Sequence, residues 1–237
     1  MSVPETAAAR DSGVDSPPRG SGAGVPPLTL DHLVWAGPSL ADLVAEFERL
    51  TGVVPAPGGV HPTGTANALV AFTVAGARGP HYLELIGPDP ARAGGGPVMT
   101  FGIDRLTGPR LATFAVHPDD IEATVSRARA GGYDPGDVRP LSRTKPDGTV
   151  LAWRLTRPAE QAPSPVLPFL IDWGATEQPG VGELPSVELV SLRGEHPDPS
   201  AVGDVLGLLG VDLDVQRADE PALVAVVRGP AGTVELR

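Results

Sequence analysis

His32 and Glu84 are the residues of this sequence best placed to do chemistry. His32 lies in the segment DHLVWAG, and Glu84 lies in YLELIG; both segments have the composition of short β-strands. An imidazole and a carboxylate can bind a divalent metal ion with open positions for an oxygen-rich substrate, or can serve as acid and base. A metal site would need at least one further protein ligand. We therefore predict that His32 and Glu84 point into one shared cavity.

A glycine-rich loop, GGVHPTGTAN, lies between these two segments and leads into a predicted strand. Its small residues would let the backbone approach a ligand, and the polar side chains of His61, Thr65 and Asn67 could fix the orientation of that ligand. The same residues also suit an ordinary surface turn. The loop lacks the Gly-Lys-Ser/Thr ending of a phosphate-binding loop.

The stretches GGVHPTGTANALVAF, YLELIGPDP, SRTKPDGTVLAW and PFLIDWG resemble the glyoxalase-like domain family of bacterial proteins. This family belongs to the glyoxalase, or vicinal oxygen chelate, superfamily. The resemblance covers roughly residues 28–173. It implies βαβββ modules that pair into an open, curled sheet with a ligand site inside, and a first-strand His and a last-strand Glu of each module as metal ligands. The resemblance thus assigns His32 and Glu84 as metal ligands, for Zn, Fe, Mn, Ni or Mg, and as catalytic residues.

The second half of the resemblance adds three candidate substrate-binding residues, Arg143, Trp153 and Asp172. A guanidinium can bind a carboxylate or enolate oxygen, and an indole can stack on a flat ligand. The alternatives are structural: Arg143 forms a salt bridge with Asp172 or Glu84, and Trp153 fills the core.

The second half lacks the metal-ligand pair of the superfamily. Alignment of its helix places Thr113 opposite His32, and alignment of its last strand on Gly174 places Ile171 opposite Glu84. A shift by one residue would bring Asp172 into register, but it would also turn over the faces of the strand. Two hypotheses therefore stay open: a metal site, and a cavity that binds its ligand without a metal.

The predicted fold is α+β, with the order strand, helix, strands repeated three times. The helix of the first repeat begins after Ser39 and ends at Gly52, and that of the second ends at Gly131. We predict two paired βαβββ modules and a third βαββ half-module that packs on the same core. The predicted boundaries are a disordered tail at 1–26, a glyoxalase-like domain at 27–177 with modules at 28–88 and 110–174, and the half-module at 183–237.

Composition excludes several classes of function. The sequence has no cysteine, so any metal must be bound by His, Asp, Glu or water. The net charge of −11 argues against nucleic-acid binding, because phosphates would be repelled. No apolar run reaches the roughly 18 residues of a membrane span, and the first residues lack the apolar core of a signal peptide. We expect a cytoplasmic monomer or homodimer whose partner is a small molecule.

Two function classes remain open. The first is a lyase, isomerase or dioxygenase that acts on a small oxygen-rich molecule, with His32 and Glu84 on a metal or serving as acid and base. The second is a binding or resistance protein of the same fold without metal, although an aromatic content of 4% is low for a stacking pocket. A structural role, in which the third repeat covers a sheet edge or makes a dimer contact, has no specific motif.

Overall fold

The computed structural model describes residues 24–92, 96–145, 147–157 and 164–237. The helices and strands are β1 (Leu30–Ala36), α1 (Leu40–Thr51), β2 (Ala56–Val60), β3 (Thr65–Val74), β4 (Ala77–Pro88), β5 (Arg110–Val116), α2 (Ile121–Ala130), β6 (Asp137–Thr144), β7 (Val150–Arg157), β8 (Phe169–Asp172), β9 (Ser186–His196), α3 (Pro199–Leu209), β10 (Val215–Arg217), β11 (Ala222–Gly229) and β12 (Gly232–Leu236), with short 3₁₀ helices η1 (Thr100–Arg105) and η2 (Pro179–Val181). The fold is α+β and is dominated by its sheet.

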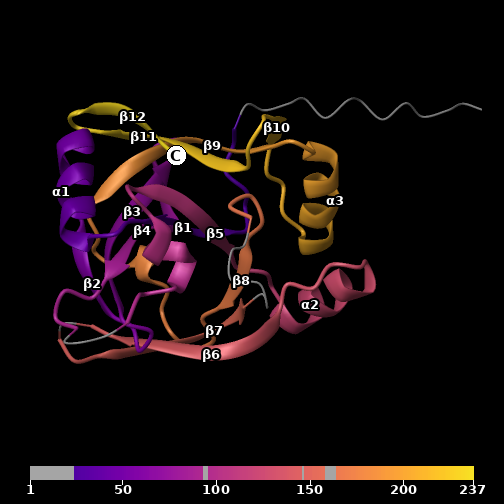
Figure 1. Ribbon diagram of the computed structural model, residues 1–237, viewed down its shortest axis with the longest axis horizontal. Coiled ribbons are helices and arrows are strands. Elements are labelled where there is room, and N and C mark those ends of the chain that lie inside the picture. The colour runs from indigo at the N-terminus through magenta and orange to yellow at the C-terminus, as the bar shows by residue number, and fades with distance from the viewer. Residues whose placement is uncertain (1–23, 93–95, 146, 158–163) are drawn as a thin grey trace, which may run out of the picture.

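The first helix begins where the sequence predicts. The Ser39 side chain accepts a hydrogen bond from the Asp42 backbone N–H at the start of α1, and Gly52 ends this helix in the left-handed conformation. α3 begins after Asp198, which caps the Ala201 N–H. Figure 1 shows α1 on one side of the strands and α2 with α3 on the other.

The sheet closes on itself, which corrects the open, curled sheet expected from the sequence. The strand order β3-β2-β6-β7-β8-β5-β1-β4 returns to β3, because β3 pairs with both β2 and β4. β2 and β6 are paired through a single residue pair, Val60 with Thr144. This pairing depends on Gly59, since a Cβ there would overlap the Thr144 carbonyl oxygen. The result is a barrel, in which successive residues of each strand point alternately inward and outward.

The third repeat lies outside this barrel. β9 pairs in parallel with the end of β3, and β11 and β12 continue the sheet from β9. A short strand, β10, pairs with β9, so the expected βαββ half-module has one strand more. α3 contacts α2, where Arg127 Nε donates a hydrogen bond of 2.8 Å to the Leu208 carbonyl. The repeat thus extends the core on the outer face of the barrel.

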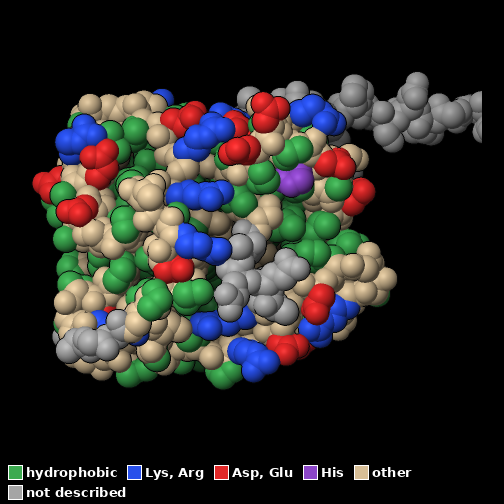
Figure 2. Space-filling model, viewed as in Figure 1, with side chains coloured by type: hydrophobic (Ala, Val, Ile, Leu, Met, Phe, Trp, Pro, Cys, Tyr) green, Lys and Arg blue, Asp and Glu red, His purple; other side chains and the backbone are tan. Residues whose placement is uncertain are grey.

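The predicted tail at 1–26 falls almost wholly outside the described residues. Its last part is tied to the core, because the Gly24 carbonyl accepts a hydrogen bond of 2.7 Å from the Leu192 N–H. None of the helices in the described part of the chain is long and apolar enough to span a bilayer. Acidic and basic side chains are interspersed on the face shown in Figure 2.

Candidate functional site

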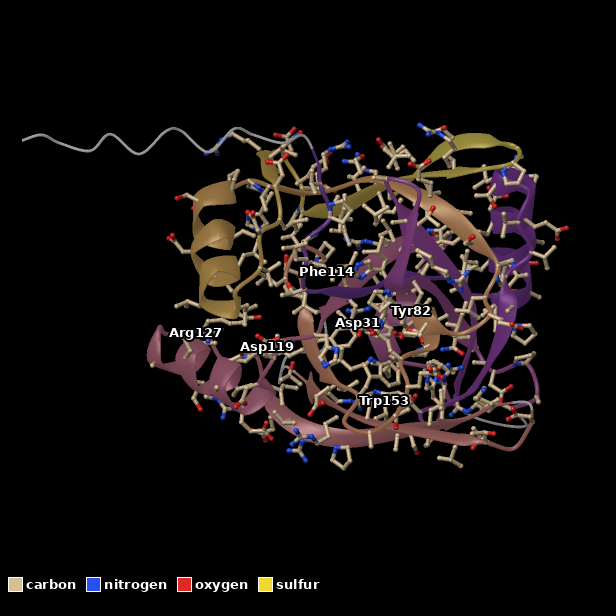
Figure 3. The ribbon with its side chains drawn as sticks, turned by 180° about the vertical axis from the view of Figure 1, so that it is seen from behind. Asp31, Tyr82, Phe114, Asp119, Arg127 and Trp153 are labelled. Atoms are coloured by element: carbon tan, nitrogen blue, oxygen red, sulfur yellow. The ribbon has the colours of Figure 1, made fainter. Side chains whose placement is uncertain are left out.

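The barrel interior contains a cavity of about 730 Å³. Strand alternation explains its lining: Leu33, Leu83 and Leu85 point outward into the main core, whereas their neighbours His32 and Glu84 point inward. Figure 3 shows Asp31, Tyr82 and Trp153 in the central part of the molecule, between the strands, and Asp119 and Arg127 at the outer helix α2. The polar residues that line the cavity include His32, His61, Thr65, Asn67, Tyr82, Glu84, Thr113, Arg143, Trp153 and Ser164.

His32 is held by the residue before it. Asp31 Oδ1 lies 2.6 Å from His32 Nδ1, and Asp31 Oδ2 accepts hydrogen bonds from Trp173 Nε1 at 2.9 Å and from Gln178 Nε2 at 2.6 Å. Adjacent strand residues normally face opposite sides of a sheet, but the pairing of β1 with β5 shifts register between Leu30 and His32. Because the carboxylate only accepts hydrogen bonds, Nδ1 carries a proton, and in the neutral ring the lone pair therefore lies on Nε2.

Glu84 faces this lone pair from the parallel strand β4. Its Oε2 lies 3.8 Å from His32 Nε2, too far for a hydrogen bond. Its other oxygen, Oε1, accepts a hydrogen bond of 2.5 Å from the Asn67 amide. Asn67 Oδ1 in turn accepts one of 3.2 Å from Arg143 Nη1. The amide thus links a buried carboxylate to a buried guanidinium. His32 and Glu84 lie side by side on the cavity wall, so one ligand atom in the cavity can contact both.

Tyr82 stacks on His32, with ring centroids 4.7 Å apart. Burial, together with the charges of Asp31 and Glu84, raises the pKa of Tyr82 well above its ordinary value. The phenol therefore stays neutral at physiological pH, and its ring limits the orientation of the imidazole.

His61 stands on the other side of Glu84. Its Nδ1 lies 2.9 Å from Thr65 Oγ1, and its Nε2 lies 3.9 Å from Glu84 Oε1. Burial lowers the pKa of His61 below its ordinary value of 6.5, and this effect outweighs the attraction of Glu84. His61 is therefore neutral at physiological pH.

The lowered pKa of His61 predicts a loss of stability in acid. As the pH falls below about 6.5, the unfolded chain binds a proton at this histidine before the folded protein does, so the free energy of unfolding decreases. His61→Gln is expected to reduce this loss, measured as the difference between urea midpoints at neutral and mildly acidic pH. The exposed His117 provides the control variant His117→Gln. An equal acid loss in His61→Gln and the wild type would contradict the assignment.

A glycine makes room for the Asn67–Arg143 pair. A Cβ at the buried Gly58 would overlap Asn67 Oδ1 and lie 2.6 Å from Arg143 Nη1. Gly58→Ala is therefore expected to break this pair and to destabilise the protein by about 1–3 kcal/mol, the usual cost of overpacking. Gly108→Ala is the matched control, because a Cβ there meets nothing within 4 Å. Urea unfolding of both variants would test the prediction, and equal midpoints would contradict it.

The structure brings most of the predicted site residues together. His32, His61, Thr65, Asn67, Glu84, Arg143 and Trp153 all line the cavity. Asp172 does not: it points away from the cavity and pairs with Arg154, and its neighbour Ile171 lines the cavity in its place. The predicted substrate-binding role of Asp172 is thus not supported by its position, and the alternative salt bridge of Asp172 with Arg143 does not form.

Asp31, Tyr82 and Gln178 are site residues that the sequence prediction missed. For Asp31 the only signal was its place directly before His32, and simple strand alternation turns such a residue away from the site. Gln178 comes from the loop after β8, and no spacing rule connects it to β1.

The donor set does not fit a metal ion. In the described part of the chain, no group of three or more His, Asp or Glu side chains is arranged to hold one. The second half of the barrel contributes Thr113 and Ile171 to the cavity instead of a second His and Glu. In addition, the Asn67 amide already donates to Glu84, and the cationic Arg143 lies next to it. A second cation would be repelled by this guanidinium.

Comparison with known proteins gives a family match and several structural likenesses. The model of the glyoxalase-like domain matches residues 30–207. No curated protein matches the sequence. A hypothetical protein from Staphylococcus aureus superposes with a TM-score of 0.53 at 16% identity, over 88% of this chain and 85% of that one. Methylmalonyl-CoA epimerase from Mycobacterium tuberculosis gives a TM-score of 0.39 at 20% identity, over 62% of this chain and 88% of that one. At 16% identity, the likeness to the Staphylococcus aureus protein bears on the fold alone.

Proposed function

This chain belongs to the glyoxalase-like domain family of the vicinal oxygen chelate superfamily, and from that premise we propose that it is an isomerase- or lyase-type enzyme. Its substrate is a small oxygen-rich molecule, and the reaction moves a proton at a carbon next to a carbonyl group. One observation carries the proposal: His32 Nε2 and Glu84 Oε2 face each other across 3.8 Å without a hydrogen bond between them. A substrate carbon in the cavity beside this pair can bring its hydrogen within reach of both atoms.

The two residues take complementary parts in this reaction. Glu84 is the base that removes the proton, because its carboxylate is fixed by Asn67 and has one oxygen that accepts no hydrogen bond from the described residues. His32 is the second proton carrier, because Asp31 fixes its Nδ1 and so aims Nε2 at the same place. The cavity walls exclude bulk water from both groups, since each is at most 8% exposed.

Solvent deuterium exchange tests the proposal. The protein would be incubated in D₂O with a panel of small 2-oxo acids and 2-hydroxyketones, and deuterium at the carbon next to the carbonyl would be followed by NMR. We expect exchange that depends on the protein for at least one compound. Binding without exchange for all bound compounds would contradict the enzyme and favour the metal-free binding protein.

The reaction is expected to continue without a metal ion. Because the donor set does not fit one and Arg143 already supplies a positive charge, exchange should be unchanged after dialysis against EDTA. Elemental analysis of protein purified without chelator should show less than one equivalent of any divalent metal. Loss of exchange in EDTA with recovery on addition of one metal would contradict this prediction.

A further inference from the structure

The inward faces of β1 and β4 become apolar directly after His32 and Glu84. The two strands run in parallel, and Val34 lies opposite Glu84. The inward positions that follow His32 are Val34 and Ala36, because alternate residues of a strand share a face. The inward position that follows Glu84 is Ile86, which lines the cavity. Toward the carboxyl ends of both strands, the interior of the barrel therefore changes from polar to apolar.

The 3₁₀ helix η1 covers this apolar end of the barrel. Val98 and Ile103 pack against the inward side chains of β1 and β4 in a small buried cluster. The residues of this segment that line the cavity are Met99, Thr100 and Phe101. Met99 is 48% exposed and Phe101 is half-buried, so both side chains have surface that a ligand can touch.

Three rings connect the reacting end of the cavity to η1. Phe169 lies edge-on to His32, with ring centroids 5.6 Å apart. The ring centroid of Phe101 lies 6.3 Å from that of Phe169. All three rings line the cavity, and Phe169, like Phe101, is only half-buried. An apolar group attached to a carbon beside His32 would therefore lie first against Phe169 and then against Phe101.

Phe101 has a backbone conformation that a bulky residue rarely adopts. Its φ is 54°, in the left-handed region, and Gly102 follows with a φ of 69°. Such a conformation costs free energy and is found preferentially at functional sites. Among the described residues, Ala75 is the other non-glycine residue with positive φ, and it lies in the hairpin turn between β3 and β4, where this conformation is usual. At Phe101 it places an aromatic ring on the cavity wall.

The cavity is large for the simplest compounds that could undergo the proposed reaction. Its volume of about 730 Å³ is typical of sites that enclose a drug-sized ligand. Pyruvate, the smallest 2-oxo acid with a C–H next to its carbonyl group, would leave most of this volume empty.

We infer that the substrate carries an alkyl chain next to its reacting carbon, and that Phe101 selects for this chain. The inference rests on the proposed function and narrows its substrate to an amphiphilic carbonyl compound. The polar groups around Glu84 bind the oxygen-rich end, and Phe169, Phe101 and Met99 contact the chain. The strength of this contact grows with the apolar area that is removed from water, so binding should depend on chain length.

Straight-chain 2-oxo acids from pyruvate to 2-oxooctanoate are the probes, and calorimetry measures their dissociation constants. We expect the affinity of the wild type to rise about threefold to fourfold for each added methylene group until the chain passes Met99. Phe101→Gly removes the ring, and glycine adopts positive φ without strain. This variant should bind 2-oxooctanoate about tenfold more weakly and pyruvate as the wild type does.

Two further variants separate the ring from other effects. Phe101→Leu keeps an apolar side chain at this position and should retain most of the dependence on chain length. Val190→Ala is the matched control, because Val190 is an exposed apolar residue on β9 outside the cavity. Its affinities should equal those of the wild type along the whole series.

Met99 provides a readout in the wild type that does not depend on whether a variant folds. The sequence has two methionines, Met1 and Met99, so ¹³C-methyl-methionine labelling gives two signals, and Met99→Leu identifies that of Met99. We expect 2-oxooctanoate to shift the Met99 methyl signal and pyruvate to leave it nearly in place.

Three results would overturn the inference: equal affinity along the series, an unchanged dependence on chain length in Phe101→Gly, or an unmoved Met99 signal at saturation with 2-oxooctanoate. Failure of this inference and failure of the proposed function are distinguishable. Deuterium exchange of pyruvate without a gain in affinity for longer chains would keep the enzyme and reject the chain site. Length-dependent binding without exchange of any compound would keep the chain site and reject the enzyme.

Discussion

The Glu84→Gln variant is expected to exchange substrate hydrogen for deuterium about 10²–10⁴-fold more slowly than the wild type, the usual contribution of a positioned base. Gln has nearly the same shape, and its amide oxygen can still accept the hydrogen bond from Asn67. The amide cannot take up a proton at neutral pH. The rate of the chemical step should therefore fall while the thermal midpoint changes little. Deuterium incorporation and a melting curve on the same sample measure both effects.

The control for this variant is Glu122→Gln. Glu122 is an exposed carboxylate on the outer helix α2 and pairs with Arg154, so the substitution removes a negative charge without touching the cavity. Exchange in Glu122→Gln should equal that of the wild type. If Glu84→Gln kept an exchange rate near that of the wild type, Glu84 would not be the base, and His32 or His61 would have to remove the proton.

The sequence predicted the meeting of His32 and Glu84 because both lie on strands with clear patterns. Their leucine neighbours mark the outer face of the barrel, so alternation sends His32 and Glu84 inward. Alignment of the last strand on Gly174 places Ile171 opposite Glu84, and Ile171 does line the cavity. Asp172 is nevertheless a predicted substrate-binding residue, because it falls in a segment that resembles the family pattern. A charged residue beside a site motif is weak evidence when strand register is the deciding quantity.

Closure of the barrel and the role of Asp31 could not be predicted in the same way. Closure depends on one contact between strands far apart in the sequence, where Gly59 lets the Thr144 carbonyl come close. The position of Asp31 depends on an irregularity in the pairing of β1 with β5, and that pairing is known only once the fold is known. Both features arise from contacts between distant segments, and local composition carries little information about such contacts.

The Asp31→Asn variant is expected to lower the exchange rate by about 10²–10⁴-fold through the tautomer of His32, although Asp31 itself touches no substrate. Trp173 and Gln178 both donate to Asp31 Oδ2, so the single side-chain oxygen of the introduced asparagine will turn toward them. The NH₂ group of that asparagine then faces His32 Nδ1, which must accept the hydrogen bond, and the ring proton moves to Nε2. Nε2 then has no lone pair with which to receive a proton.

This tautomer change separates positioning from stability. The ¹⁵N chemical shifts of the His32 ring nitrogens should exchange their protonated and unprotonated signatures in Asp31→Asn, and kcat should fall with little change in KM. Asp31→Ala serves as the comparison, because it leaves three hydrogen-bond partners without an acceptor and should destabilise the protein by about 1–3 kcal/mol for each buried donor left unsatisfied. An Asp31→Asn protein with the wild-type tautomer and a reduced rate would show that Asp31 acts by its charge instead of by orienting His32. A wild-type rate would show that His32 does not carry the proton.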